Sequence, residues 1–547
     1  MKARRQNVWT EDNIVKSPYV DVEIPDITLP EYIWRNIENW VDKTAMVCGI
    51  TDRSYTYREL YDYSQNFAAT LRSQLHIQDG DVVGLMTYNS IEYPIALMGA
   101  IQAGAIVTTF SPAFTTNEVH RQLLLAKPKL MIGSLETIGV IKEAIYLTET
   151  SIPIIIADNF EVDALPGTLS FADLFNNNKI DKNILNEVRR KPEDVIFLLY
   201  SSGTTGLPKG VELTNRNQVA NFIQQEAEGL KHFKDTTGEY QDSVLVVIPL
   251  YHSYGLSISL LHNLTIGAKI VVIPKFQRKT FLNALKDHKI SLLYSAPPLF
   301  QFLCTHPDVT KDHLTTLERI VCGAAPLTTS YIKNLLCKAQ PNLQIIQAYG
   351  LTEVSPFATS MVPGSRDYAT IGVALPNTEL RVVDSSDRNL GPDEVGELHI
   401  RGPQVMKGYK DNPEATMNAI TEDKWFRTGD LATINNDGIV TLVGRMKELI
   451  KVKGYQVAPT ELEDILKEHP DIKDAAVVGI PDERKGEVPK AFVVLKDGYK
   501  TTATNLINFV NTKVAEYKML KEVEFLDDLP KNLAGKLLRR VLLEKYC

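Results

Sequence analysis

The sequence has few cysteines and no long apolar run, and both shortages narrow the class of protein. Five cysteines occur among 547 residues, at positions 48, 304, 322, 337 and 547. Their odd number and the absence of any Cys-x-x-Cys pair exclude a readable disulfide framework or zinc knuckle. The longest apolar stretches, such as 244–250, are far shorter than the ~18–20 residues of a membrane span. We therefore expect a protein of a reducing compartment with no membrane span.

The sequence also has no excess of positive charge. Lys and Arg number 59 against 67 Asp and Glu, which gives a net charge of -8 and disfavours a nucleic-acid partner. The basic N-terminus runs into Trp9-Thr-Glu rather than an apolar segment, so no signal peptide is recognised. The last residues, Lys545-Tyr-Cys, differ from the peroxisomal Ser-Lys-Leu signal. We expect a cytoplasmic protein, a monomer or weak homodimer, and leave a peroxisomal location open.

Helical and apolar segments alternate through the first 350 residues. Residues 57–71 and 93–103 have helical spacing, whereas 81–86 and 129–132 have the apolar character of buried strands. The same rhythm predicts further strands at 194–200, 243–249, 269–273, 291–295, 319–322 and 344–347. Strands that alternate with helices predict a mainly parallel sheet flanked by helices.

The pattern changes after residue 372. Alternating segments at 379–384 and 397–401 predict an antiparallel hairpin. Thr460-Glu-Leu-Glu463 resembles a capping box, which predicts a helix that begins there and must end by Pro470. The predicted fold is a large α/β body with an antiparallel β-rich subdomain, residues 1–443, followed by a small, mobile α+β lid, residues 444–547.

Residues 200–210, Tyr-Ser-Ser-Gly-Thr-Thr-Gly-Leu-Pro-Lys-Gly, follow an apolar strand. Glycines allow backbone N–H groups to turn toward an anion, hydroxyls add donors and Lys209 adds charge, which is typical of a phosphate-binding loop. Gly210 follows Lys209 where a Walker A loop has Ser or Thr. A solvated turn is the alternative interpretation.

This loop and four later segments resemble, in the same order, the motifs of the adenylate-forming superfamily. The later segments are 347–353 (Gln-Ala-Tyr-Gly-Leu-Thr-Glu), 425–430 (Trp-Phe-Arg-Thr-Gly-Asp), 444–456 and 530–540. The resemblance covers nearly the whole chain and is strongest to the branch of 4-coumarate–CoA ligases and luciferase-like acyl-CoA synthetases. It implies an enzyme that uses ATP, Mg²⁺ and coenzyme A to convert a small carboxylic acid into an acyl-adenylate and then an acyl-CoA thioester.

The resemblance also assigns roles to residues. It implies that Lys536 serves adenylation and Lys451 serves thioester formation, so that the lid must rotate between the two steps. Thr352 and His252 are the other expected catalytic residues, and Glu353 is the expected Mg²⁺ ligand. Nucleotide and coenzyme A contacts are expected from Ser201, Ser202, Gly203, Thr204, Thr205, Lys209, Lys275, Gly323, Gln347, Ala348, Tyr349, Asp430, Arg445, Lys447, Lys453, Gly454 and Gln456.

The resemblance also places an acyl pocket. Its expected residues are His252, Ser253, Tyr254, Ile258, Ala325, Ala348, Pro356 and Phe357. Ala348 and Phe357 are larger than their counterparts in plant 4-coumarate ligases, so a medium- or long-chain fatty acid is an alternative substrate. Asn221 stands where beetle luciferases have Arg, which disfavours luciferase chemistry. A non-catalytic nucleotide- or acyl-binding protein is the alternative from a different functional class.

Overall fold

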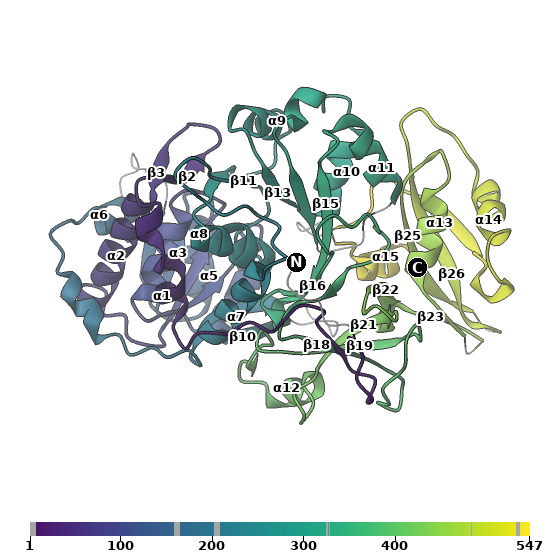
Figure 1. The fold of residues 1–547 in the computed structure, drawn as a ribbon, viewed down its shortest axis with the longest axis horizontal. Coiled ribbons are helices and arrows are strands. Elements are labelled where there is room, and N and C mark those ends of the chain that lie inside the picture. The colour runs from purple at the N-terminus through teal and green to yellow at the C-terminus, as the bar shows by residue number, and fades with distance from the viewer. Residues whose placement is uncertain are drawn as a thin grey trace.

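The computed structural model describes residues 7–157, 165–201, 208–323, 327, 329–453, 455–482, 484–531 and 536–547. The strands of these residues form four sheets. Figure 1 shows the two large sheets in the left and centre of the molecule and the C-terminal sheet at the right edge. No helix of the described residues is long and apolar enough to cross a bilayer.

The first large sheet is mainly parallel and carries the strand before the predicted phosphate loop. In spatial order its strands are β20 (Gly408–Tyr409), β10 (Lys209–Thr214), β9 (Val195–Ser201), β5 (Ile106–Thr109), β4 (Val82–Met86), β6 (Leu130–Gly133), β7 (Ile154–Ile156) and β8 (Leu169–Ser170). The helices in the same part of the chain are α2 (Tyr57–Ser73), α3 (Tyr93–Gln102), α4 (Thr116–Ala126), α5 (Ile138–Leu147) and α6 (Phe171–Phe175). Helix α2 begins at Thr56 because its hydroxyl accepts from the Glu59 amide while the Glu59 carboxylate accepts from the Thr56 amide.

The second large sheet brings together strands from both ends of the body. Its order is β17 (Val373–Ala374), β16 (Phe357–Ser360), β15 (Gln344–Gly350), β14 (Arg319–Cys322), β13 (Leu292–Ser295), β11 (Ser243–Val246), β12 (Lys269–Val272), β2 (Thr44–Cys48) and β3 (Ser54–Thr56). Other helices of the body are α1 (Leu29–Trp34), α7 (Asn215–Glu226), α8 (Asn263–Thr265), α9 (Arg278–Asp287), α10 (Pro297–Thr305) and α11 (Thr329–Lys338). A π-helical segment, Tyr254–His262, leads directly into α8.

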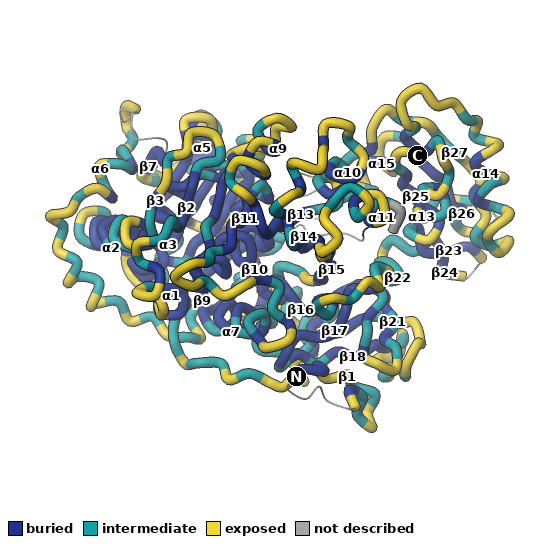
Figure 2. The backbone as a smooth tube through the Cα atoms, turned by 45° about the horizontal axis from the view of Figure 1, so that its top comes forward, coloured by how far each residue is buried: buried dark blue, intermediate teal, exposed yellow. Residues whose placement is uncertain are grey.

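Burial explains why the parallel strands are apolar throughout. Figure 2 shows the buried residues concentrated in the strands of the two large sheets, and one contiguous core extends through both. A parallel sheet covered by helices on both faces needs apolar side chains on both faces. The predicted alternation of strands and helices is therefore confirmed.

The antiparallel subdomain and the C-terminal region follow. The subdomain contains β1 (Val15–Lys16), β18 (Glu379–Val383), β19 (Gly396–Arg401), β21 (Phe426–Ile434) and β22 (Val440–Arg445), with α12 (Pro413–Ala419) beside it. The C-terminal region contains β23 (Ile450–Val452), β24 (Tyr455–Val457), α13 (Pro459–Lys467), β25 (Ile472–Asp482), β26 (Gly486–Leu495), α14 (Ala503–Asn511), β27 (Glu522–Phe525) and α15 (Arg539–Tyr546). It has its own hydrophobic clusters, as the predicted α+β unit requires.

The predicted capping box at Thr460 is wrong. Helix α13 begins at Pro459 with Ala458 as its N-cap residue, and no side chain caps it. The Thr460 hydroxyl instead donates to the Val443 carbonyl at 2.9 Å. A tertiary hydrogen bond has thus taken the hydroxyl that the local pattern assigned to the helix end.

Candidate active site

Lys536 lies against the body of the protein rather than in solvent. Burial lowers the pKa of its ammonium group, and the positive charge of Arg445 lowers it further. The carboxylates of Glu448, Asp430 and Glu353 act in the opposite direction. Residues far apart in the sequence therefore surround the lysine that the sequence predicted as the adenylation residue.

Asp430, one of the carboxylates near Lys536, has two polar partners of its own. Its carboxylate is buried, and its Oδ2 accepts from the Tyr349 hydroxyl at 2.6 Å. Its Oδ1 lies 3.1 Å from the Arg445 Nε. Strands β21 and β22 place Asp430 directly opposite Arg445, which explains why the two side chains meet. Each carboxylate oxygen can accept more than one hydrogen bond, so this group is fixed in place yet able to bind a diol.

Glu353 has a comparable arrangement beside the phosphate-loop strand. Its Oε1 accepts from the Ser201 hydroxyl at 2.8 Å and from the Tyr409 hydroxyl at 3.1 Å. The described residues contain no group of three or more His, Cys, Asp or Glu that could hold a metal ion. A single carboxylate suits Mg²⁺, which is typically held by one or two carboxylates together with phosphate oxygens and water. Glu353 therefore fits the role of a Mg²⁺ ligand.

Lys209 lies over the ring of the tyrosine that contacts the same glutamate. Its Nζ is 5.1 Å from the centroid of the Tyr409 ring, and the Tyr409 hydroxyl is the group that donates to Glu353. Tyr409 thus contacts both Lys209 and Glu353, and Glu353 also contacts Ser201 at the end of strand β9. The predicted contacts of Ser202, Gly203, Thr204 and Thr205 lie outside the described residues.

The residues predicted for the acyl side of the site come from in or beside the π-helical segment and strands β15 and β16. The Ser253 and Thr352 hydroxyls are 3.2 Å apart. Burial and the charge of Lys536 lower the pKa of His252 to about 4, so its imidazole is neutral near pH 7. The Tyr254 ring lies 5.8 Å from that of Phe357. The residues predicted for the carboxylate site and those predicted for the acyl pocket therefore lie beside one another.

Several predicted residues act through backbone or packing contacts. The Gln347 side chain accepts from the Leu327 amide at 3.1 Å and donates to the Tyr368 carbonyl at 2.6 Å, so it holds two loops together. Four other predicted site residues are also buried: Ile258, Gly323, Ala348 and Pro356. A Cβ on Gly323 would lie 3.4 Å from the Ala348 carbonyl oxygen. Ala325 lies outside the described residues.

The structure does not bring every predicted residue to this cluster. Lys451 and Lys453 are exposed near strand β23, and Lys447 is exposed in the turn that precedes it. Lys275 pairs with Glu136 at 2.5 Å and covers the Tyr88 ring at 4.0 Å. Gly454 and the Gln456 side chain lie outside the described residues.

Sequence reasoning missed three residues of the site. Tyr409 orients Glu353, as described above. Glu448 lies close enough to Lys536 to raise its pKa, and its Oε2 pairs with Arg539 Nη1 at 2.6 Å. Arg539 also pairs with Glu463 at 2.6 Å. Glu448 and Arg539 occur within two of the recognised motifs, but nothing in the sequence indicates that residues 91 positions apart form an ion pair.

Comparisons with known proteins agree with this geometry. The family model described as AMP-binding enzyme matches residues 33–410, and that of the AMP-binding enzyme C-terminal domain matches residues 461–536. 4-Coumarate--CoA ligase 3 of Oryza sativa subsp. japonica is 36% identical, over 98% of this chain and 96% of the rice protein.

Solved structures are similar over nearly the full length. ATP-bound MatB from Rhodopseudomonas palustris has a TM-score of 0.85 and 26% identity, over 95% of this chain and 99% of that one. The apo form of the same protein gives a TM-score of 0.75 at the same identity and coverage. The structure of this chain thus has an arrangement closer to that of the ATP-bound form.

Proposed function

The chain belongs to the AMP-binding enzyme family, and from this premise we propose that it is an ATP- and Mg²⁺-dependent carboxylate–CoA ligase. The observation that carries the proposal is the position of Lys536 beside His252, Asp430 and Glu353. Asp430, Glu353 and His252 are the candidates for the ribose, metal and acyl sites. A lysine close to all three is suited to the formation of the acyl-adenylate, which is the first half-reaction. The greater similarity to ATP-bound MatB supports the same interpretation.

In the first half-reaction, a carboxylate oxygen of the acid attacks the α-phosphorus of ATP. The bond to the β-phosphate breaks, pyrophosphate leaves and an acyl-adenylate forms. Lys536 supplies positive charge where negative charge develops on the carboxylate and α-phosphate oxygens, and Thr352 donates to the α-phosphate. Asp430 accepts from the ribose hydroxyls. Mg²⁺, held by Glu353, would neutralise phosphate charge.

In the second half-reaction, the thiolate of coenzyme A attacks the acyl carbonyl and AMP leaves. Lys451 is the residue proposed to reach AMP in this step, with Lys453 at the edge of the coenzyme A site. Both are exposed and lie outside the Lys536 cluster, so we propose that residues 444–547 rotate as a lid about the segment around Lys447. Thr460, which donates to the carbonyl of Val443, links the two sides of this boundary.

Two substrate classes follow from different observations. The curated relatives are named as 4-coumarate–CoA ligases, which favours a hydroxycinnamate-like acid for this chain. The Phe357 ring packs against the Tyr254 ring and adds bulk to the wall of the proposed acyl pocket. A pocket with less space for a rigid ring favours a flexible medium- or long-chain fatty acid. Hydroxycinnamates remain the first candidate because the resemblance extends over nearly the whole chain.

Pyrophosphate release and coenzyme A consumption test the proposal. Purified protein with ATP and Mg²⁺ is given a panel of cinnamates and of C8–C18 fatty acids. We expect acid-dependent release of pyrophosphate, followed by loss of free thiol when coenzyme A is added. Complete absence of acid-dependent release over the panel would contradict ligase activity and favour a binding protein.

A further inference from the structure

Tyr409 contacts two groups of opposite charge that the proposed function uses. Its hydroxyl donates to the Oε1 atom of Glu353 at 3.1 Å. The Lys209 Nζ lies over its ring, 5.1 Å from the centroid, which is within the range of a cation–π contact. Lys209 and Glu353 form no ion pair with each other in the described part of the chain. One phenol side chain therefore binds a carboxylate at its hydroxyl and a cation at its ring.

The register of three strands brings these side chains together. Lys209 on β10 lies opposite Ser201 on β9, and Val211 on β10 lies opposite Tyr409 on β20. Side chains two residues apart on a strand share a face of the sheet, and long side chains reach their diagonal neighbours on the next strand. Ser201, Lys209 and Tyr409 therefore share one face. The Ser201 hydroxyl on that face also donates to Glu353 Oε1, at 2.8 Å.

The backbone around Tyr409 is anchored as well. Its amide donates to the Thr416 hydroxyl at 2.9 Å. The Met406 amide, three residues earlier, donates to the Glu353 carbonyl at 2.8 Å. The segment that ends in strand β20 thus binds both the main chain and the side chain of Glu353.

The two carboxylate oxygens of Glu353 have different surroundings. Oε1 accepts from both Ser201 and Tyr409, whereas no donor of the described residues bonds Oε2. Burial and the adjacent carboxylate raise the pKa of Tyr409, so its phenol stays protonated and remains a donor near pH 7. Hydrogen bonds to one oxygen orient the carboxylate and leave the other oxygen for a metal ion.

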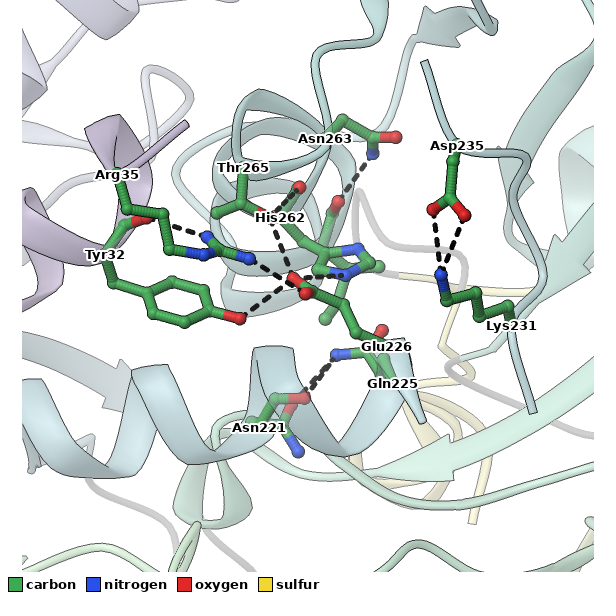
Figure 3. A network of polar contacts seen from close by, with 11 residues as sticks. Tyr32, Arg35, Asn221, Gln225, Glu226, Lys231, Asp235, His262, Asn263 and Thr265 are labelled. Carbon is green, nitrogen blue, oxygen red and sulfur yellow. Dashed lines mark hydrogen bonds and ion pairs between the residues drawn. The ribbon is translucent and has the colours of Figure 1, made fainter. Parts of the chain in front are cut away.

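A second tyrosine–glutamate pair shows what distinguishes this one. Tyr32 donates to Glu226 at 3.0 Å, and Arg35 donates to the same carboxylate at 2.9 Å, as Figure 3 shows. The charge of Glu226 is thus balanced by a guanidinium of the protein. Glu353 is buried, with 6% of its surface exposed, and has two hydroxyl donors but no ion pair among the described residues. A buried carboxylate of this kind favours a bound cation.

We propose that Tyr409 is a positioning residue for Mg²⁺–ATP. Its hydroxyl orients Glu353 toward the metal while its ring carries Lys209, so that the carboxylate and the ammonium group stay apart until the metal and the phosphates bind them. An ion pair between the two would neutralise the charge that each group needs. The inference rests on the proposed ligase function, in which Glu353 holds Mg²⁺ and Lys209 contacts phosphate.

Tyr409→Phe tests the hydroxyl, because it removes that group and keeps the ring for Lys209. Loss of a hydrogen bond that orients a metal ligand typically weakens metal binding about 10–100-fold. We therefore expect the free Mg²⁺ concentration at half-maximal pyrophosphate release to rise at least about tenfold, while the rate at saturating Mg²⁺ falls less than about twofold. Tyr32→Phe is the matched control, since it removes the same kind of hydrogen bond at Glu226. An unchanged Mg²⁺ dependence in Tyr409→Phe would overturn the inference.

Calorimetry provides a readout that does not depend on turnover. Without an acid substrate ATP is not consumed, so its Kd can be measured both with Mg²⁺ and with EDTA. We expect Tyr409→Phe to raise the Kd of Mg²⁺–ATP, whereas the Kd in EDTA should change less than about twofold. Tyr32→Phe should leave both values unchanged. Equal increases in both values for Tyr409→Phe, as a general structural defect would give, would overturn the inference.

Tyr409→Leu tests the ring. Its loss leaves Lys209 free to pair with Glu353, so the Kd of ATP in EDTA should rise at least about threefold. Adding Glu353→Gln to this variant removes the carboxylate charge and should restore that Kd to within about twofold of the wild-type value. An unchanged Kd in Tyr409→Leu, or no recovery in the double variant, would overturn the separation of the two charges.

Failure of the proposed ligase function would give a different result. If the wild-type protein binds Mg²⁺–ATP but releases no acid-dependent pyrophosphate, the ligase function is refuted, and the calorimetric comparison still decides the role of Tyr409. If the wild-type protein binds no ATP, both proposals are refuted.

Discussion

Two lysine-bearing surfaces of the C-terminal region differ sharply. Lys536 is withdrawn from solvent, and its pKa is lowered by burial and by Arg445. Lys451 is exposed on strand β23, where its backbone amide donates to Glu487 at 2.7 Å. One arrangement of the lid cannot place both lysines in the same cluster of acyl and nucleotide residues. Under the proposed mechanism, this arrangement suits adenylation, and the second half-reaction would require another.

The largest effect is expected from Lys536→Ala. Loss of one preorganised charge at a transition state costs about 10²–10³ in rate, so acid-dependent pyrophosphate release should fall by that factor. The variant should still convert supplied acyl-adenylate to thioester. Single-turnover assays of each half-reaction measure the difference, with Lys545→Ala on helix α15 as the control. Equal losses in both half-reactions would contradict the assignment.

The reciprocal variant, Lys451→Ala, should reverse the pattern. Because Lys451 lies outside the Lys536 cluster, pyrophosphate release should change less than about twofold, whereas thioester formation from supplied acyl-adenylate should fall by about 10²-fold. Lys500→Ala, which removes another exposed lysine of the lid, serves as the control. A normal rate of thioester formation in Lys451→Ala would remove the reason to propose rotation.

The decline of the adenylation rate at alkaline pH should also distinguish Lys536 from Lys451. A lowered pKa means that Lys536 loses its proton at a lower pH than an exposed lysine, so activity that needs the charged form is lost as pH rises through that pKa. Above it, kcat/KM for ATP should fall about tenfold per pH unit. Lys536→Arg should remove this decline because guanidinium stays charged, whereas Lys451→Arg should not. Identical profiles for all three proteins would show that Lys536 does not control this limb.

The parallel core could be predicted because burial on both faces imposes an apolar pattern that is visible locally. Strand β4 and helix α3, for example, follow from their own residues. Thr460 shows the limit of such reasoning. Its local pattern matches a capping box, but the Val443 carbonyl competes for the hydroxyl, and only the folded chain brings that carbonyl near.

The candidate site likewise has residues that sequence motifs predict and contacts that only the folded chain forms. Motif resemblance predicted both Asp430 and Arg445 as site residues, and the β21–β22 register places the two face to face. The ion pair of Glu448 with Arg539 and the orientation of Glu353 by Tyr409 depend on tertiary contacts. The two residues of each pair lie far apart in the sequence, and no periodic pattern or motif spacing links them.

The smallest effect on the two half-reactions is expected from a change at Tyr331, where the proposed lid contacts the body away from Lys536 and Asp430. The Tyr331 hydroxyl on helix α11 donates to the Lys473 carbonyl on strand β25 at 3.1 Å, and Gln301 on α10 donates to the Tyr331 hydroxyl at 3.0 Å. In the proposed mechanism, these bonds help to hold the lid in the arrangement that buries Lys536. Tyr331→Phe removes a hydrogen bond worth about 0.5–1.5 kcal/mol, which corresponds to roughly a 2- to 10-fold shift between lid arrangements.

The ratio of the thioester-forming rate to the adenylation rate should therefore rise by about that factor in Tyr331→Phe, as measured by the same single-turnover assays. Tyr146→Phe, at a tyrosine that is 82% exposed on helix α5, should leave the ratio unchanged. Within the described part of the chain, Tyr331 hydrogen-bonds to the lid but to none of the proposed nucleotide or acyl residues, so a change in the ratio would arise from the position of the lid. An unchanged ratio would mean that the Lys536 cluster alone holds the lid closed.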